Sequence, residues 1–584
     1  MKETKSVSDD SAVAESVSSV LYKNMVYLEQ FAESILGYTS KYNSNMSISY
    51  APENLIGKPS KFPDYGDFPE TYMLRSYGKW WHKSEATQAH YMPQDADPVI
   101  AEDYVSVKFE YPVFPDLIII YETYNPGAVV RLWGRMTGNS WKLLWEGPPQ
   151  LCTQTSRKFT VKIKKIPNTI NEVRIELNQS LLKYHTSLDA ILLAGYRPKS
   201  ALQSSIITKD LLNSISPKKT LKEIPPSCND ICENTDYFSS LPYEVLVHIF
   251  HYLDLRSLCR CSQVNQRFFE ASVDASLYRE LSLKRYWHKV DRNTLSYLMA
   301  RCKTLKKLDL SWCGNDNMIS EEIFVEFLQK CGSYLTHLSL GNCDFVKMTS
   351  LEQIGKCQEI TDLRLRNAQC CSWRYNALAN LKKLTALDLY SSNIVDDLLI
   401  DILKSNPNLK HLIIDFCSDL ERLDQVTKVA SQYNKNLITW SSWKTQSLTS
   451  VGVTNLARCN LLKELDLGWC LLLSDPGDCL ERIAHGCKDL RRLIISGWRG
   501  INDHLLLPVI RSCKNLTQLD LLGVKTISKD IVERILASLS KLELLEISFC
   551  DSINSEQVAV WRQQYPQVTI QRSCEYVVVD YWDL

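Results

Sequence analysis

Cysteine and histidine are the residue types of this chain with the widest range of functional chemistry. The sequence contains 20 cysteines and 10 histidines. Cysteines can pair as disulfides, bind zinc or act as nucleophiles. We do not expect a disulfide framework, because the first residues, MKETKSVSDDSAVAES, contain no apolar segment of a secretory signal. A zinc site is not expected either, because the pairs Cys228/Cys232 and Cys259/Cys261 stand alone, outside any paired C-x-x-C spacing. The sequence predicts no metal and no cofactor.

Catalytic motifs are missing from the sequence as well. It contains no G-x-S-x-G, H-E-x-x-H, G-x-G-x-x-G or P-loop pattern. Carboxylates recur at Asp309, Asp388, Asp466 and Asp520, each inside a leucine-rich frame. Because these carboxylates recur at one place in the frame, we interpret them as acceptors for a basic partner rather than as members of a catalytic acid/base pair. We therefore predict a non-catalytic protein.

Length and composition further restrict the class of protein to which the chain can belong. A chain of 584 residues is too long for one core and predicts two to four domains. Lys plus Arg and Asp plus Glu are both 67, so the formal charge is zero, which argues against a nucleic-acid partner held by bulk electrostatics. No run of about 18 apolar residues predicts a transmembrane helix. With no signal or transit peptide recognisable, we expect an intracellular, cytoplasmic chain.

The C-terminal half repeats the frame L-x-x-L-x-L. Examples are LKKLDLSWC at 305–313, LTHLSLGNC at 335–343 and LKELDLGWC at 462–470. The second Leu position occurs ten times between residues 308 and 545, with a mean period of about 26 residues, inside the range of leucine-rich repeats. These positions are 308, 338, 363, 387, 412, 440, 465, 493, 519 and 545.

Eleven cysteines occupy two fixed places in this repeat. Cysteine is often a small buried hydrophobe, so we interpret them as packing residues rather than reactive thiols. The pattern resembles the cysteine-containing subclass of leucine-rich repeats. The cysteines before the frame are Cys302, Cys331, Cys357, Cys459, Cys487 and Cys513, and those that close it are Cys313, Cys343, Cys417, Cys470 and Cys550.

Each repeat would supply one strand and one helix, stacked into an α/β horseshoe with parallel strands on its concave side. The Leu side chains would point inward, and the intervening residues would face a partner, because strand side chains alternate. Several large aromatic residues would then be exposed on one surface, which is typical of a binding site, unless they pack under neighbouring repeats or the C-terminal tail. The predicted substrate-binding residues are Trp312, Tyr390, Phe416, Trp443, Asp466, Trp469 and Phe549.

Before the repeats lies FSSLPYEVLVHIFHYLDLRSLCRCSQVNQRF, residues 238–268. Its apolar residues fall on one helical face, and the LPxExLxxIFxYL spacing resembles an F-box. That resemblance implies docking onto a Skp-type adaptor of a cullin–RING ubiquitin ligase; alternatively, the face packs on the first repeat. His248 and His251 are expected to be a solvated pair rather than metal ligands. The implied adaptor-binding residues are Leu241, Pro242, Val245, Leu246, Ile249, Phe250 and Leu253.

The N-terminal half has a different pattern. Residues 17–36 carry apolar residues at a spacing typical of an amphipathic helix, which could dock on a neighbouring domain or, less in keeping with its few basic residues, on a membrane. From about residue 60 alternating apolar segments predict an antiparallel β-sandwich, which resembles galactose-binding-like (discoidin-type) jelly rolls. The predicted domains are 1–59 (N-terminal segment with the helix), 60–197 (sandwich), 198–236 (linker), 237–284 (F-box), 285–570 (repeats) and 571–584 (tail).

This order of domains resembles the F-box and leucine-rich-repeat protein four family. The resemblance implies a substrate receptor that joins adaptor, cullin and RING subunits and brings a protein substrate close to the conjugating enzyme. It further implies turnover of mitophagy receptors and a mitochondrial outer-surface location, while a cytosolic or nuclear location stays open. Two other classes are a carbohydrate- or lipid-binding scaffold and an extracellular receptor; the second would need disulfides. The sequence names neither the substrate nor a sandwich ligand.

Overall fold

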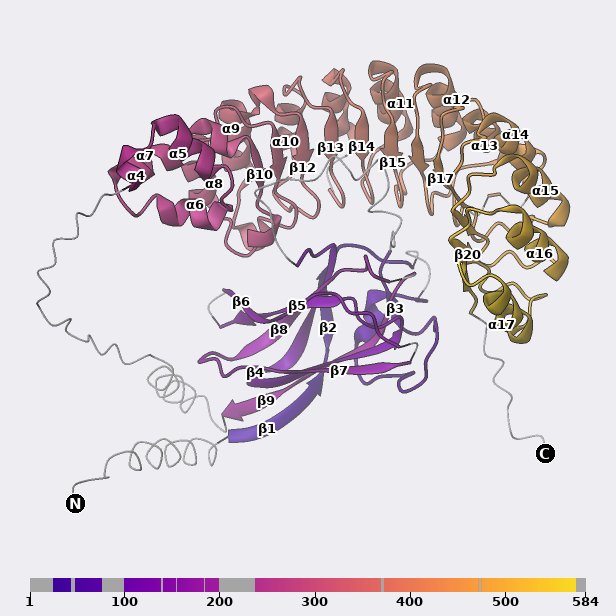
Figure 1. The fold of residues 1–584 in the computed structure, drawn as a ribbon, viewed down its shortest axis with the longest axis horizontal. Helices are drawn as coiled ribbons and strands as arrows, with labels where there is room; N and C mark the ends of the chain where they lie inside the picture. Colours follow the sequence, from indigo (N-terminus) through magenta and orange to yellow (C-terminus); the bar gives the residue numbers. More distant parts are fainter. Residues whose placement is uncertain are drawn as a thin grey trace, which may run out of the picture. The chain divides into compact units, whose positions relative to one another are not determined.

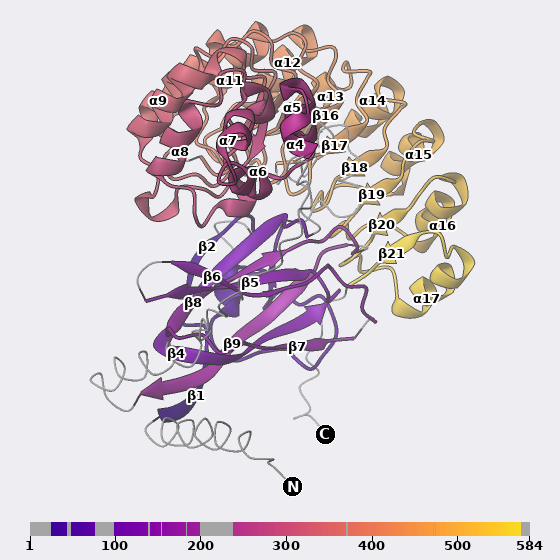
Figure 2. The ribbon, with the colours of Figure 1, turned by 60° about the vertical axis from the view of Figure 1, so that its left-hand side comes forward.

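The computed structural model describes residues 25–43, 48–75, 99–137, 140–153, 155–182, 184–198, 237–368, 372–470, 472–473 and 475–573. They form two compact units, one that holds the described residues up to 198 and one from Phe238 onward. Figures 1 and 2 show a β-rich body and a row of strand–helix repeats preceded by short helices. Apart from Pro198, the last residue of β9, the predicted linker 198–236 lies outside the described residues. In the described part of the chain, no helix is long and apolar enough to cross a membrane.

The first unit is made of antiparallel strands around one long strand, β4, of 22 residues. The first half of β4 pairs with β2 and β8, and its second half pairs with β7 and β9, so β4 belongs to two sheets. The strands are β1 (Met25–Phe31), β2 (Ser34–Tyr38), β3 (Tyr72–Met73), β4 (Asp103–Tyr124), β5 (Val129–Met136), β6 (Trp141–Glu146), β7 (Arg157–Lys162), β8 (Ile170–Leu177) and β9 (Ser187–Pro198), with a 3-10 helix, η1 (Pro52–Leu55).

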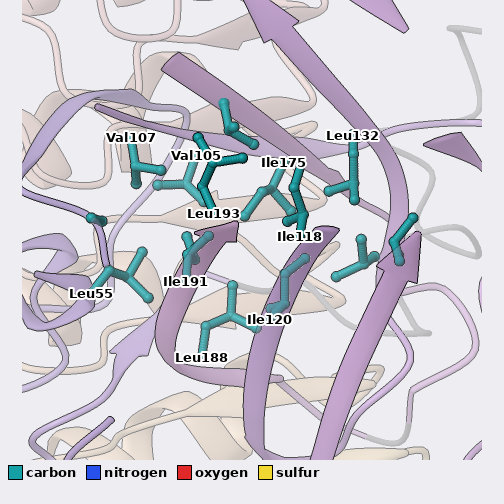
Figure 3. Close-up of a cluster of buried hydrophobic side chains, with 14 of the residues drawn as sticks. Leu55, Val105, Val107, Ile118, Ile120, Leu132, Ile175, Leu188, Ile191 and Leu193 are labelled. Atoms are coloured by element: carbon teal, nitrogen blue, oxygen red, sulfur yellow. The ribbon is translucent and has the colours of Figure 1, made fainter. Parts of the chain in front are cut away.

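The core of this unit collects alternate residues from several of these strands. Ile118 and Ile120 of β4 and Ile191 and Leu193 of β9 are fully buried, as the two-residue period of a strand requires. Figure 3 shows them meeting side chains of β5 and β8, such as Ile175. Burial of each such side chain stabilises the fold by about 1.5–3 kcal/mol. The discoidin-like class of this unit stays a prediction.

The predicted N-terminal helix is wrong over its described part. Residues 25–31 form β1, which pairs with β9 from Met25↔Pro198 to Phe31↔Leu192, and residues 34–38 form β2, which pairs with β4. The apolar residues at 25, 28, 31 and 35 have the spacing of a helix, but pairing with β9 and β4 overrides this local preference. The β unit therefore begins by residue 25 and not at 60; residues 17–24 lie outside the described residues.

The second unit opens with four short helices and continues as a twelve-stranded parallel sheet whose strands follow the order of the sequence. The helices that open it are α4 (Tyr237–Ser240), α5 (Tyr243–Phe250), α6 (Leu255–Cys261) and α7 (Gln266–Ser272). The strands are β10 (Glu280–Ser282), β11 (Lys307–Asp309), β12 (His337–Ser339), β13 (Asp362–Arg364), β14 (Ala386–Asp388), β15 (His411–Ile413), β16 (Thr439–Ser441), β17 (Glu464–Asp466), β18 (Arg492–Ile494), β19 (Gln518–Asp520), β20 (Leu544–Glu546) and β21 (Thr569–Gln571).

A 3-10 segment, η3, precedes the first strand, and helices or 3-10 segments connect the strands that follow; Figure 1 shows the helices α9 to α16 along one side of the row of strands. The helices and 3-10 segments are η3 (Ala275–Tyr278), η4 (Lys284–Tyr286), α8 (Arg292–Met299), η5 (Asn315–Asn317), α9 (Glu321–Cys331), η6 (Gly332–Tyr334), α10 (Met348–Ile354), η7 (Ser372–Asn380), α11 (Asp396–Ser405), α12 (Leu423–Tyr433), α13 (Ser450–Leu456), α14 (Cys479–Gly486), α15 (Asp503–Ser512), α16 (Lys529–Ser538) and α17 (Ser555–Gln564).

The predicted frame is confirmed in register. Each second Leu position is the middle residue of a strand and pairs with its equivalent in the next repeat, as in Leu308↔Leu338 and Leu412↔Trp440. Two strands go beyond the ten predicted frames: β10, centred on Leu281, and β21, centred on Ile570. The sheet therefore begins before residue 285, and the horseshoe shape stays a prediction.

The repeat cysteines are buried, as predicted. Each closing cysteine also donates its thiol to a main-chain carbonyl of the preceding repeat: Cys343 to Leu310 O at 3.0 Å and Cys417 to Leu389 O at 3.1 Å. Burial raises the pKa of the Cys417 thiol to about 12, so it stays protonated and able to donate at neutral pH. The cysteines are thus both packing residues and hydrogen-bond donors.

We predict that the eleven repeat cysteines resist alkylation by iodoacetamide at pH 8 in the native chain, because the reactive thiolate is scarce when the pKa is raised. Cys152, which is exposed, is the internal control and should be labelled. Peptide mass spectrometry with and without denaturant measures each site. Native labelling of Cys417 or Cys470 at the rate of Cys152 would contradict their burial.

Candidate functional site

The F-box helices owe their ends to specific capping residues. Asp254 accepts a hydrogen bond from the Ser257 N–H at 2.7 Å at the start of α6, and Asn265 accepts one from the Phe268 N–H at 2.8 Å at the start of α7. Such caps satisfy N–H groups that the helix itself cannot pair. Pro242 is the N-cap residue of α5, with φ −57° and ψ 150°.

Helix α5 divides its apolar residues between the inside and the outside of this module. Leu246 and Phe250 are 0% and 2% exposed, and the Phe250 ring lies 5.4 Å from Phe268. Val245 and Ile249 are 41% and 37% exposed although both are large aliphatic residues. One side of α5 therefore belongs to the core, and the other carries apolar side chains into solvent.

Tyr252, which follows α5, was not among the residues predicted to bind an adaptor, and it is 80% exposed. It lies three residues after Ile249 and seven after Val245, a spacing that puts all three on one helical stripe. We call Val245, Ile249 and Tyr252 the α5 outer stripe. The spacing of four and seven residues from Val245 is the signal in the sequence that indicates this stripe.

The remaining predicted adaptor residues are less exposed or sit at the ends of α5. Pro242 is exposed, whereas Leu241 and Leu253 are half-buried. The main-chain oxygen of Leu241 accepts a hydrogen bond from the Arg267 guanidinium, which ties the start of α5 to α7. His251 lies 3.3 Å from the Ser276 hydroxyl, and among the described residues no cluster of His, Cys, Asp and Glu could hold a metal ion.

A left-handed turn follows each strand of the repeat sheet from β11 to β20. Trp312, Phe416, Trp469 and Phe549, four residues after the middle of their strands, have φ values of 71°, 58°, 60° and 57°. Each main-chain N–H donates to the carbonyl of the next repeat; for example, Trp469 donates to Ser496 O at 2.7 Å. These residues are therefore not strand positions that alternate outward, as the sequence suggested, but turn positions.

Four neighbouring rings pack along these turns. Tyr390, Phe416 and Trp443 stand edge to face, with centroids 5.7 and 4.9 Å apart, and Trp469 follows in the next repeat. The Lys444 ammonium lies 4.5 Å from the Trp443 ring and 5.6 Å from both Phe416 and Trp469. We call Tyr390, Phe416, Trp443 and Trp469 the ring row; Lys444, which the sequence did not single out, joins three of its members by cation–π contacts.

The expected exposure is wrong for three of the six aromatic residues, and for these the alternative of packing under neighbouring repeats holds. Trp312, Tyr390 and Trp443 are buried at 4%, 2% and 0%, whereas the structure leaves Phe416, Trp469 and Phe549 half-buried. Glycine makes this packing possible: a Cβ at Gly468 would lie 2.7 Å from the Trp443 ring, and one at Gly497 would lie 2.8 Å from the Trp469 ring. Local packing against the neighbouring repeat covers these rings.

Asp466 is also buried, at 1%, and serves its own turn. Its carboxylate accepts a hydrogen bond from the Gly468 N–H at 3.2 Å, and the Arg492 guanidinium lies 3.6 Å away. Asp388 and Asp520 accept the equivalent bond from Tyr390 and Leu522 at 3.1 and 3.0 Å. These repeated carboxylates therefore stabilise turns, which corrects the expectation that they await a basic partner.

We predict that Trp443→Ala destabilises the chain by about 3–5 kcal/mol, because it removes a fully buried ring and leaves a cavity between two repeats. Thermal unfolding followed by circular dichroism measures the change. Tyr334→Ala, which truncates an aromatic side chain that is 59% exposed, is the matched control and should leave the melting temperature within about 2 °C. Equal melting temperatures for the two variants would contradict the packing of the ring row.

Residues 238–284 match the family model described as F-box-like. Two solved structures are similar over part of the chain: a chain of the yeast Rad7 and Elc1 complex, at 16% identity and TM-score 0.35 over 64% of this chain and 92% of that one, and the family 32 carbohydrate-binding module of Streptococcus pneumoniae EndoD, at 7% and 0.20 over 28% and 99%.

A full-length relative is F-box/LRR-repeat protein 4 of Bos taurus. It is 33% identical to this chain over 577 residues, which cover 93% of this chain and 91% of the relative. The match therefore spans both units and includes the capped F-box helices and the repeat sheet described above. Identity at this level over nearly the full length shows that the chain belongs to the F-box/LRR-repeat protein 4 family.

Proposed function

We propose that this protein is the substrate receptor of an SCF-type ubiquitin ligase. The F-box helices bind a Skp-type adaptor, and the repeats bind a protein substrate. The observation that carries the proposal is the α5 outer stripe. Val245 and Ile249 are exposed on α5 and Tyr252 just after it, while the other side of this helix forms the core of the module, and exposed apolar stripes of this kind are typical of interaction sites.

The mechanism that we propose is proximity. The receptor performs no bond chemistry; it holds a substrate lysine near the conjugating enzyme and raises its effective concentration there. Substrate contact is assigned to the half-buried side chains along the turns, Phe416, Trp469 and Phe549, together with Lys444. The fully buried Trp443 and Tyr390 support these residues from behind rather than bind the substrate themselves.

The substrates that we propose are mitophagy receptors, which the family resemblance suggests, and the place of action is the mitochondrial outer surface. The first unit would add a further contact to the same assembly. The substrate class rests on the family resemblance alone, so it is tested separately from adaptor binding. If the half-life of mitophagy receptors in cells does not depend on this chain although adaptor capture is intact, the substrate class is wrong and the receptor role still stands.

We predict that Val245→Glu with Ile249→Glu reduces adaptor capture by at least about a hundredfold, because two apolar contacts are replaced by charges at the centre of an interface. Affinity capture of purified chain with a Skp-type adaptor measures it. Val560→Glu, on exposed α17 (44% exposed), is the control for a surface charge elsewhere. Both variants should melt like the parent chain, and full adaptor capture by the double variant would refute the F-box role of the stripe.

We predict that Trp469→Ala with Lys444→Ala at least doubles the half-life of a mitophagy receptor in cells, because interface aromatics contribute most of the binding energy. Cycloheximide chase with a proteasome-inhibited arm measures the half-life, and adaptor capture should not change. The control is Lys435→Ala, an exposed lysine in the loop before β16. An unchanged half-life in a variant that still binds the adaptor would exclude this surface as the substrate site.

A further inference from the structure

Positive charge is concentrated at one edge of the repeat sheet. The twelve strands are parallel and follow the order of the sequence, so the residues just before each strand lie at the same edge. We call the residues two to eight positions before the middle of each strand from β11 to β20 the pre-strand edge. They include 17 of the 67 lysines and arginines of the chain but only three of its 67 aspartates and glutamates. A formal charge of zero therefore conceals a strongly basic edge.

Several of these cations extend into solvent with no carboxylate beside them. Lys306, Lys410 and Arg491, in three different repeats, are exposed, and among the described residues none of them forms an ion pair. Lys383, by contrast, lies 2.7 Å from Glu359, but this pair is exposed as well, so solvent weakens it. The edge can therefore bind the anionic groups of a partner.

A main-chain ladder fixes the spacing of the pre-strand edge. The N–H group two positions before the middle of a strand donates to the carbonyl at the same place in the preceding repeat, as from Lys410 to Thr385 O at 2.8 Å. This hydrogen bond recurs in each repeat from Thr336 to Glu543. Neighbouring strands are about 4.8 Å apart, so the ten repeats present their cations along about 43 Å.

Helix dipoles explain only part of this charge. Each repeat helix ends at the pre-strand edge, and a cation in the last turn of a helix interacts favourably with its dipole. Lys330 and Lys404 lie in the last turns of α9 and α11 and fit this role. Lys306, Lys410 and Arg491 lie five or more residues beyond the ends of α8, α11 and α14. The dipole effect falls off within the last turn, so it does not account for these three cations.

Three large side chains of apolar character are exposed among the cations. Tyr334, Tyr433 and Leu461 are 59%, 46% and 48% exposed. Tyr334 and Leu461 hold the same place, four residues before the middle of their strands, and the other eight frames have a polar or charged residue there. Tyrosine and leucine side chains beside lysines are typical of surfaces that bind at the membrane–water interface.

A nucleic acid fits this pattern less well. Proteins that bind single strands stack successive bases on aromatic side chains. Tyr334 precedes β12 and Tyr433 precedes β16, four strands or about 19 Å apart, which is too far for neighbouring bases. Many cations with scattered apolar side chains favour a lipid surface instead, because its anionic groups repeat in two dimensions.

We propose that the pre-strand edge binds an anionic membrane surface. Its lysines and arginines contact the phosphate and carboxylate groups of lipid headgroups, and Tyr334, Tyr433 and Leu461 enter the interface. The turns that follow the strands lie at the opposite edge of the sheet, so this binding leaves Phe416 and Trp469 uncovered. Lipid binding is a property of this chain alone and does not rest on the receptor role.

The test measures sedimentation of the full chain with large vesicles. Vesicles of phosphatidylcholine with about 30% phosphatidylserine should bind the chain at least about tenfold more tightly than vesicles of phosphatidylcholine alone. Binding should weaken as salt rises from about 50 to 300 mM, because the shorter Debye length screens the headgroup charge. A folded chain that does not bind the anionic vesicles would overturn the proposal.

Charge reversal locates the binding surface. Lys306→Glu with Lys410→Glu and Arg491→Glu should weaken binding to the anionic vesicles at least about thirtyfold, because each cation near such a surface contributes about fivefold. The matched control reverses three exposed cations that follow a strand rather than precede one: Lys347→Glu, Arg499→Glu and Lys529→Glu. It changes the net charge by the same amount and should weaken binding by less than about threefold. Both variants should melt like the parent chain, and equal weakening by the two would contradict the proposal.

Truncation of the apolar side chains separates a lipid surface from a nucleic acid. Tyr334→Ala with Leu461→Ala should weaken binding to the anionic vesicles at least about fivefold, because less apolar surface then enters the interface. The second probe is a fluorescein-labelled single-stranded DNA of about 30 nucleotides, longer than one binding site. Tighter binding of this DNA than of the anionic vesicles, or unchanged vesicle binding by the double variant, would refute the lipid assignment. Adaptor capture plays no part in these tests, so their outcome is separate from that of the receptor role.

Discussion

The hydrogen bonds that join one repeat to the next at the left-handed turn hold the second unit in register. Each strand has three residues, too few to align neighbours by its own ladder alone, and the turn extends that ladder. The N–H groups of Trp312 and Phe549 donate to the next repeat at 2.8 Å each. A non-glycine residue in this conformation costs about 1–2 kcal/mol. The turn persists because carboxylates such as Asp466 and the ladder itself offset that cost.

The same junction explains why cysteine recurs. In six of the described repeats, a main-chain carbonyl two residues after the middle of the strand accepts a hydrogen bond from the closing side chain of the following repeat. Cys343 and Cys417 bond it through their thiols, and in one repeat the Trp498 indole N–H takes over, bonding Leu467 O at 2.8 Å. Leu310 O and Leu389 O also accept main-chain N–H groups, from Cys313 and Ser392 at 3.0 Å each, so the thiol adds a second hydrogen bond to each carbonyl. The side chain at this place therefore joins one repeat to the next by a hydrogen bond as well as by packing.

Sequence patterns were informative where a local period coincides with the tertiary arrangement. The 26-residue spacing of leucines predicted the parallel pairing, because each repeat must stack on its neighbour to bury its apolar side. The F-box spacing predicted α5, and burial then separated Leu246, a core residue, from Ile249, which faces solvent. No pattern on a single helix distinguishes these two roles, since both residues are large and aliphatic; the packing of one side of α5 against α7 decides between them.

By itself the sequence determined the place of the F-box, the repeat frame and the buried state of its cysteines, because these depend on the spacing of apolar residues and on the repeat period. Only the tertiary structure decided that residues 25–31 form a strand, since its partner, Pro198 to Leu192, lies more than 160 residues away in the chain. It also decided that Trp443 is buried and Phe416 is half-buried. A left-handed turn redirects a side chain from solvent onto the next repeat, and a non-glycine residue gives little local sign of it, because the hydrogen bonds and packing that hold the turn come from the neighbouring repeat.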